Sequence, residues 1–290
     1  AAALSYLFSK EINAENKDLA KIAVVGMVGD MHDQNLNRRY TEILKDANSM
    51  IKKGLLLYPS TRPINKALEF SSGMFIPGVT GNPKGVINLL REAGIKKKDN
   101  KYKSIIELDD KEMSQVITSI ILRRSKQKND NIIGNIYLLK FFNKIEDARE
   151  ISALINACGR LERSEIALAF CLENKNAKKE AEKIYIKYKQ HLISALNYVN
   201  NCKEKIDGPN FTIINAKDNV KDTIIGTVAS ILSKSAIYNE GTIIVTMAYN
   251  GEKIKISTRI AGRTGRNLKE LVESVIKTIG GEYGGHNLAA

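Results

Sequence analysis

The sequence predicts an α/β protein in which a long helical connector separates the end of a parallel-sheet domain from a carboxy-terminal α/β unit with a mixed sheet. Three patterns support this class. Leu19 to Val28 is a nearly continuous apolar run, typical of a strand buried on both faces. Ala177 to Asn200 repeats apolar residues at spacings of three and four, as amphipathic helices do. Thr242 to Ala248 and Lys253 to Ile260 alternate apolar and polar residues, and Asn250-Gly251 between them predicts a hairpin with a type I′ turn.

Residues 1–48 are expected to hold a helix, the buried strand and a second helix. The first helical pattern is already under way at Ala1, which predicts that the natural protein begins further upstream. The strand ends at Gly29-Asp30. Because the carboxyl ends of strands line the ligand crevice of open α/β folds, Asp30 is well placed for chemistry. The alternative interpretation is a helix N-cap, a position that aspartate favours.

Residues 49–205 are predicted to be a helical connector or insertion, interrupted by proline and glycine. Expected helices run from Lys84 to Ala93, from a cap at Asp109 to Arg124, and from Glu146 to Cys158. The Ala177 to Asn200 helix closes this segment. Its apolar stripe, opposite a lysine-rich face, predicts a connector helix packed between two domains, with a coiled-coil arm or a partner surface as the alternative.

Residues 206–290 are predicted to form a compact α/β unit that begins near Asp207-Gly208-Pro209. The expected elements are a strand from Phe211 to Ile214, a helix from Asp222 to Ser235, the hairpin, and a last helix from Asn267 to Ile279.

Composition narrows the classes of partner. The net charge of +13 and the pI of about 9.5 favour an anionic partner, of which nucleic acid is the commonest, although lysine-rich surfaces also serve solubility alone. No apolar run approaches the ~20 residues that span a bilayer, so no membrane association is predicted. The three cysteines lack metal-binding spacing, which argues against structural zinc and for a reducing cytoplasm.

The end of the chain, Gly284-Gly285-His286, indicates an anion-binding turn. Glycines let the backbone approach a bound group, their amides form a concavity, and the histidine donates a hydrogen bond or a charge. Ser257 and Arg259 add a hydroxyl and a planar fork on one face of the preceding strand. The plain alternative for the turn is a helix C-cap followed by a tail of small residues.

Several motifs occur in one order along the chain. They are Gly26-Met27-Val28-Gly29-Asp30, Arg62-Pro63 with Ile76-Pro77-Gly78-Val79-Thr80-Gly81, Asn156-Ala157-Cys158-Gly159-Arg160, Ile225-Gly226-Thr227-Val228-Ala229-Ser230, Ser257-Thr258-Arg259 and Gly284-Gly285-His286. With them the chain resembles the DHH phosphoesterase superfamily, and most closely its archaeal RecJ-like nucleases, over nearly its whole length. Tyr283 departs from the pattern, because the family usually has a further glycine there. The resemblance makes residues 1–48 the end of the DHH metal domain and residues 206–290 the DHH-associated, substrate-binding domain.

The resemblance also implies roles for individual residues. Asp30 becomes a catalytic metal ligand, and His286 becomes catalytic as well as substrate-binding. Substrate binding is implied for Ser257, Arg259, Gly284, Gly285, His286, Asn156 and Arg160, with Arg263 and Arg266 adding positive charge nearby. The family's Asp-His-His run is absent from this sequence, and His32 is interpreted as a surface residue. A site for two manganese or magnesium ions would therefore come mostly from residues upstream.

The function implied by the resemblance is a metal-dependent, cytoplasmic exonuclease of DNA repair or replication that acts on single-stranded DNA, RNA or both. This chain would supply the substrate-binding half and be inactive alone. Two alternatives stay open. One is a catalytically weak replisome or repair scaffold that binds GINS or a repair helicase. The other is a nano-RNase or small-nucleotide phosphatase of the same superfamily, which the long insertion disfavours.

Overall fold

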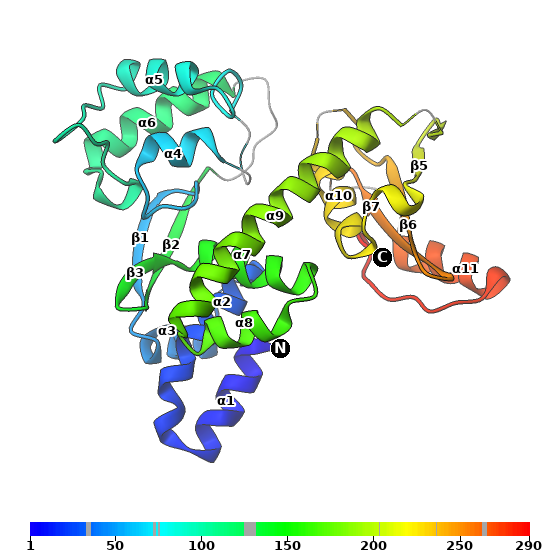
Figure 1. The fold of residues 1–290 in the computed structure, drawn as a ribbon, viewed down its shortest axis with the longest axis horizontal. Coiled ribbons are helices and arrows are strands. Elements are labelled where there is room, and N and C mark those ends of the chain that lie inside the picture. The colour runs from blue at the N-terminus through cyan, green and yellow to red at the C-terminus, as the bar shows by residue number, and fades with distance from the viewer. Residues whose placement is uncertain are drawn as a thin grey trace. The chain divides into compact units, whose positions relative to one another are not determined.

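The computed structural model describes residues 1–32, 36–71, 74, 76–124, 132–202, 204–235, 237–262 and 266–290. The chain divides into two compact units (Figure 1). The first consists of Ala1–Asn156 and Ser164–Ala181, and the second of Ala157–Arg163 and Glu182–Ala290. Each unit combines helices with a sheet, so the predicted α/β class is confirmed. The domain boundaries expected after residues 48 and 205 stay predictions.

The first unit begins with helices where a strand was expected. Helix α1 (Ala2–Ile12), the 3₁₀ helix η1 (Ala14–Leu19), α2 (Ala20–Gly29) and α3 (Arg38–Asp46) follow one another. The predicted strand over Leu19 to Val28 is therefore wrong. Helix α2 buries residues around most of its circumference, so it shows no amphipathic period, and a short apolar run of this kind cannot be told from a buried strand. The described part of residues 1–48 contributes no strand to a parallel sheet.

A three-stranded antiparallel sheet follows, within the segment expected to be helical. Strands β1 (Met50–Leu55), β2 (Ile133–Phe141) and β3 (Lys144–Asp147) are neighbours in that order. The sequence prediction missed all three. Strand β2 carries a short apolar run that is buried from Ile136 to Leu139, and such a run is ambiguous between strand and helix when no period is visible.

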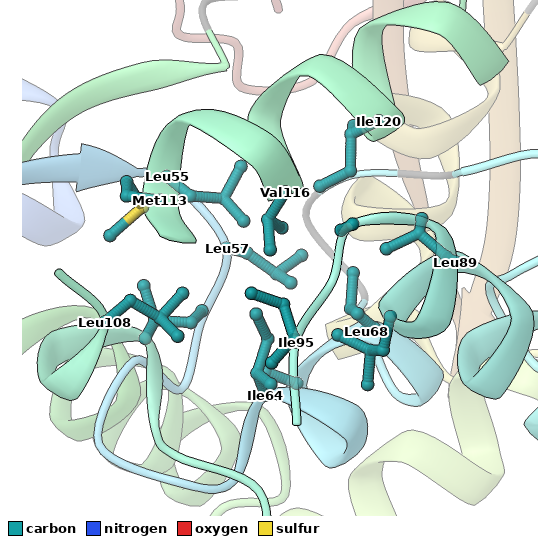
Figure 2. Packing of buried hydrophobic residues seen from close by; sticks show 14 of the residues in the cluster. Leu55, Leu57, Ile64, Leu68, Leu89, Ile95, Leu108, Met113, Val116 and Ile120 are labelled. Atoms are coloured by element: carbon teal, nitrogen blue, oxygen red, sulfur yellow. The ribbon is translucent and has the colours of Figure 1, made fainter. Parts of the chain in front are cut away.

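Between β1 and β2 the chain forms α4 (Ile64–Glu69), α5 (Pro83–Glu92), the 3₁₀ helix η3 (Ile105–Glu107) and α6 (Asp110–Arg123). The expected helices α5 and α6 are confirmed. Asp109 and Glu112 form the capping box of α6, each accepting a hydrogen bond from the other's amide. The helices and strands enclose one apolar core, part of which is shown in Figure 2.

Helices α7 (Ala148–Arg160), α8 (Ser164–Cys171) and α9 (Lys175–Asn200) link the two units. The prediction of α7 and α9 is confirmed, although Gly159 lies inside α7 rather than ending it. In the first unit α2 lies close to α7. A Cβ added at Gly29 of α2 would collide with the side chain of Ser152 of α7.

The second unit is built on a four-stranded mixed sheet, as predicted. Strands β4 (Ile206–Gly208), β5 (Phe211–Asn215), β6 (Ile243–Asn250) and β7 (Lys253–Ile260) are neighbours in that order, and the β5–β6 pair is parallel. The 3₁₀ helix η4 (Lys217–Asn219) and α10 (Asp222–Lys234) connect this parallel pair, and α10 packs on β6 and β7 (Figure 1). The last helix is α11 (Leu268–Ile279).

The hairpin between β6 and β7 is present, but its turn differs from the expected one. Asn250 pairs with Lys253, so Gly251 and Glu252 are the two central residues. Of these two, Gly251 has a positive φ, 58°, and Glu252 does not. Glycine with positive φ at the first central position is the pattern of a type II′ turn rather than type I′, and it matches the twist of the strands equally well.

The core of the second unit forms around α10, which packs on the sheet, and includes residues of α9. Helix α9 contributes Tyr188, Ala195 and Val199, and its apolar stripe is thus part of a core rather than a free arm. The other buried members are Ala157, Ile214, Ala216, Val220, Ile224, Ile225, Val228, Leu232, Ile244, Ala248 and Ala261. Among the residues described, none of the helices has the length and apolar character needed to cross a membrane.

Candidate anion-binding site

Ser257 and Arg259 lie on the face of β7 that α10 covers. A Cβ added at Gly226 of α10 would lie 3.2 Å from Ser257 Oγ, so glycine lets the helix approach the strand at this point. One helical turn later, Ser230 Oγ accepts a hydrogen bond from Arg259 Nε at 3.1 Å. Gly226 and Ser230, four residues apart on α10, thus lie against Ser257 and Arg259, two residues apart on β7. The two β7 side chains share one face, and their role in binding stays a prediction.

The Arg259 guanidinium is half-buried and contacts neutral acceptors. Besides Ser230, its Nη1 donates to the carbonyl oxygens of Thr258 at 2.8 Å and Ala290 at 3.4 Å. Among the described residues no carboxylate pairs with it. Burial lowers the pKa of Arg259, and the charge of Arg160 lowers it further. An arginine stays protonated despite such shifts, so this position carries a positive charge with reduced hydration.

Arg160 places a second cation against α10, seven residues before Ser230. It is exposed at the end of α7, and its Nη1 donates to the carbonyl oxygen of Thr223, in the first turn of α10, at 3.2 Å. Within the described part of the chain Arg160 also has no carboxylate partner. Two neighbouring guanidiniums without a counter-ion create a local positive potential, which an anion would neutralise.

The carboxy-terminal tail runs alongside β7 as a short antiparallel segment. The Thr258 amide donates to the Ala290 carbonyl at 2.6 Å, and the Ala290 amide donates to the Thr258 carbonyl at 3.1 Å. Ala289 lies opposite Arg259 in this pairing. The structure therefore brings the tail and the Ser257–Arg259 strand together in one unit.

The glycine turn before this tail serves the chain's own fold. Gly285 has a φ of 148°, and a Cβ there would lie 2.6 Å from Ala290 Cα, so the tail folds back against it. The His286 amide donates to the Ala289 carbonyl at 2.7 Å. The exposed His286 ring accepts a hydrogen bond from the Leu288 amide through Nδ1 at 3.3 Å. The binding of an anion by Gly284, Gly285 and His286 stays a prediction.

Asp30 does not follow a strand, contrary to the prediction. It is the exposed C-cap of α2, and its amide donates to the Gly26 carbonyl at 3.0 Å. The end of a helix carries partial negative charge, which disfavours a carboxylate there unless a cation compensates it. Asp30 and the exposed Asn156 belong to the first unit, whereas Arg160 and the β7 residues belong to the second.

The remaining candidates can be placed individually. The described ranges contain no group of three or more His, Cys, Asp or Glu side chains suited to hold a metal ion. Cys158, Cys171 and Cys202 form no disulfide. His32 stacks on Tyr40 with ring centroids 5.9 Å apart. Arg266 is exposed, and Arg263 lies outside the residues that the structure describes.

The sequence prediction assigned no role to Gly226 or Ser230, although both lie in one of the motifs that carried the resemblance. Their spacing of four residues on a predicted helix was the available signal, because it places both on one face. What the helix face would contact could not be read from the spacing. The structure supplies that contact as Ser257 for Gly226 and Arg259 for Ser230.

Comparison with known proteins identifies two domain types along the chain. Residues 57–132 match the family model of the DHH-CID domain, and residues 208–290 match that of the DHHA1 domain. The two matches together cover more than half of the chain. The DHH-CID match contains α4, α5 and α6, and the DHHA1 match contains Arg259 and the carboxy-terminal tail.

Two longer proteins are similar to the chain over most or all of its length. An uncharacterised protein of Methanocaldococcus jannaschii is 27% identical over 298 aligned residues, which cover 100% of this chain and 62% of that protein. The crystal structure of CDC45 from Entamoeba histolytica superposes with a TM-score of 0.54 at 10% identity, covering 89% of this chain and 60% of the other. This second likeness concerns the fold alone. The chain thus spans about three fifths of the length of these relatives.

Proposed function

Since the chain belongs to the DHH phosphoesterase superfamily, we propose that it forms the substrate-binding part of a RecJ-type exonuclease that acts on single-stranded DNA or RNA. Members of this superfamily usually hydrolyse phosphodiester bonds. The exonuclease activity is proposed for the longer protein, because the chain spans about three fifths of its relatives. The binding step is proposed for this chain.

One observation carries the proposal: Arg259 is a half-buried cation that contacts neutral oxygens and lies near a second cation, Arg160. A charge that loses hydration without gaining an opposite charge is unfavourable. A bound phosphate would compensate it, because the guanidinium fork matches a pair of phosphate oxygens. Ser230 and the Thr258 carbonyl hold the fork in place before the ligand arrives.

The residues of this chain then have defined tasks in the reaction. Arg259 and Arg160 neutralise non-bridging oxygens of the phosphate, which both binds the substrate and favours a transition state with more negative charge. The exposed His286 ring adds a donor at the edge of the site. Holding the phosphate in a fixed orientation is the second contribution, since in-line attack depends on orientation.

Manganese or magnesium is proposed as the cofactor of the longer protein and not of this chain. The one carboxylate carried over from the family, Asp30, lies exposed at a helix end, and the described residues provide no group of three metal ligands. That donor set does not fit a two-metal site, which needs several carboxylates or imidazoles. We therefore assign to this chain no step that involves a metal ion.

The binding step is tested by fluorescence anisotropy with a labelled twelve-nucleotide oligothymidylate in the presence of EDTA. Arg259→Ala should weaken binding about tenfold or more, because it removes a charged hydrogen-bond donor. Lys277→Ala is the matched control, since Lys277 is exposed and pairs with Glu273 on the surface of α11. Equal losses in both variants, or unchanged affinity for Arg259→Ala, would remove Arg259 from the site.

The catalytic half of the proposal is tested with end-labelled substrates. The 290-residue chain is expected to bind strands without degrading them in manganese, whereas the longer protein should shorten them from one end. Parallel reactions with 5′- and 3′-labelled DNA and RNA report polarity and preference. Manganese-dependent degradation by the 290-residue chain alone would contradict the assignment of a binding role.

A second candidate function is a scaffold subunit that binds GINS or a repair helicase. The fold that the chain shares with CDC45 is the observation that favours it. A pull-down of GINS by the longer protein, combined with absence of degradation under the same conditions, would support this candidate over the exonuclease.

A further inference from the structure

We infer that two copies of this chain associate through the second unit, by the face of its sheet opposite α10 and the apolar stripe of α11. The side of β4–β7 that faces away from α10 is called the open sheet face below. Ser257 and Arg259 lie on the other side of β7, against α10, so this interface leaves them free. The inference is thus separate from the proposed function.

The open sheet face is apolar and carries no charge. Residues paired across neighbouring strands point to the same side of a sheet, so Ile213, Val245 and Met247 share this face with Ile256. All the charged residues of β4–β7 lie on the side of α10, and they are Asp207, Lys253, Lys255 and Arg259. In a chain with 27% charged residues, such a face suits contact with protein better than contact with water.

The exposure of the strands shows that the open sheet face lacks a cover. On β6 the alternate residues from Ile244 to Ala248, which face α10, are fully buried, whereas Val245 and Met247 between them are only partly buried. On β7 the Ile254 and Ile256 side chains are 54% and 40% exposed. A sheet with antiparallel strands can have one side in water, but the residues on that side are then mostly polar. The apolar residues here indicate a missing layer.

Helix α11 has an apolar stripe that is also mostly uncovered. Its apolar residues recur at spacings of three and four, which places them on one side of the helix. They are Leu268, Leu271, Val272, Val275, Ile276 and Ile279. Leu268 is fully buried, whereas Val275 and Ile279 are 47% and 65% exposed. The helix packs on β7 through its first turn, and the remainder of the stripe lacks an apolar layer among the residues described.

The two apolar surfaces are together large enough for a dimer. At about 3.3 Å per residue and about 4.8 Å between strands, β4–β7 present roughly 400 Å² of sheet face. The stripe of α11 adds roughly 200 Å², at about 1.5 Å per residue and a helix width of about 10 Å. Specific interfaces bury from about 600 Å² on each partner, and uncovered apolar patches of this size are uncommon on monomers.

A second copy of the chain fits this surface because each copy supplies both of the parts that the other lacks. In a two-fold symmetric dimer, α11 of each copy packs on the open sheet face of its partner. The sheet then has helices on both sides, and the stripe of α11 is buried. Nucleic acid or a charged protein surface would gain no ion pair from an uncharged face, so these partners fit it poorly.

The test is sedimentation equilibrium of the 290-residue chain, free of nucleic acid, at about 1 to 100 µM. The mass should rise with concentration from 32.2 kDa toward twice this value. Ile254→Glu/Ile256→Glu and Val275→Glu/Ile279→Glu each bury carboxylates in the interface and should raise the dissociation constant about tenfold or more. Lys255→Glu is the matched control, because it changes the net charge equally on the other side of β7 and should leave the dimer intact.

The replaced apolar residues are exposed, so both double variants should unfold at the temperature of the parent, as followed by circular dichroism. Added salt should strengthen the dimer, because it screens the repulsion between two chains of net charge +13. A parent chain that stays at 32.2 kDa overturns the inference, as does a control that dissociates like the double variants. The longer protein should dimerise too. A monomeric longer protein would overturn the inference, because its additional segment would then cover the face within one chain.

Discussion

The two units use the same types of charged residue in opposite ways. In the first unit the fully buried Asp147 accepts hydrogen bonds from the amide, Nε and Nη2 of Arg149 and from the Ser60 amide. Charge there is neutralised within the fold. In the second unit Arg259 and Arg160 contact neutral oxygens and lie near one another. Among the described residues no carboxylate neutralises the charge there, and the binding role proposed for Arg259 rests on this difference.

The charged residues of the two units should respond differently to substitution. A buried pair cannot lose one member without leaving the other uncompensated, so it is constrained by stability. An uncompensated cation is constrained by its ligand instead, and its removal relieves repulsion in the free protein. Substitutions in the buried pair of the first unit should therefore change the stability of the fold. Substitutions of the cations of the second unit should change the affinity for the ligand.

The largest expected effect is in the first unit. Asp147→Ala leaves Arg149 mostly buried without its partner and should lower the free energy of unfolding by about 3–5 kcal/mol. Hydrogen exchange followed by mass spectrometry on β2 and β3 should show faster exchange, and thermal unfolding followed by circular dichroism should shift to lower temperature. Exchange rates like those of the parent would break the comparison, because the pair would then be dispensable.

The matching change in the second unit is Arg259→Met, which keeps the aliphatic volume and removes the charge. We expect the free energy of unfolding to change by less than about 1 kcal/mol, since the lost hydrogen bonds are offset by relief of repulsion from Arg160. Affinity for the twelve-nucleotide strand should still fall about tenfold or more. A large loss of stability with little loss of affinity would make Arg259 a structural residue like Arg149.

Elements with a visible period were predicted correctly. Helix α9 and strand β6 bury one face, so their apolar residues recur at spacings that identify helix and strand. Helix α2 and strand β2 carry apolar runs without a period, and these produced a wrong strand and a missed strand. Periodicity reports one-sided burial, and it is lost where an element is covered on several sides.

The candidate site likewise has one part that was predicted from the sequence and one part that was not. Ser257 and Arg259 were predicted to share a face because alternation along one strand is a local property. The contacts of Arg259 with Ser230, and of Arg160 with the Thr223 carbonyl, join segments 29 and 63 residues apart in sequence. No spacing in the sequence encodes such tertiary contacts, so they required the structure.

A smaller effect tests whether compensation in the first unit is complete. Glu150 pairs with the more exposed Arg62, but its Oε2 is buried without a partner, and burial raises the pKa of Glu150. The folded state therefore holds this proton more tightly than the unfolded state. The resulting stability is present below the ordinary glutamate pKa of about 4.3 and is lost as pH rises through the higher pKa of the folded state.

Glu150→Gln should remove this dependence, because the amide stays neutral. The free energy of unfolding of the variant, relative to that of the parent, should rise from pH 4 to pH 7. Loss of the ion pair with Arg62 should cost little, because the Arg62 side chain is exposed. Urea unfolding of both proteins across this range gives the difference directly. A difference that falls with rising pH would show that Arg62 fully compensates the carboxylate and would strengthen the contrast between the units.

The smallest expected effect concerns the residue that positions Arg259. Ser230→Ala removes the acceptor for Arg259 Nε and should lower affinity for the twelve-nucleotide strand about threefold to tenfold, the equivalent of one hydrogen bond. Ser230→Thr keeps the hydroxyl and should restore most of the affinity. In the Arg259→Ala background Ser230→Ala should have no further effect, because the two residues act through one contact. Additive losses in this double-mutant cycle would mean that Ser230 contributes to α10 packing, and Arg259 would then be held by the Thr258 and Ala290 carbonyls alone.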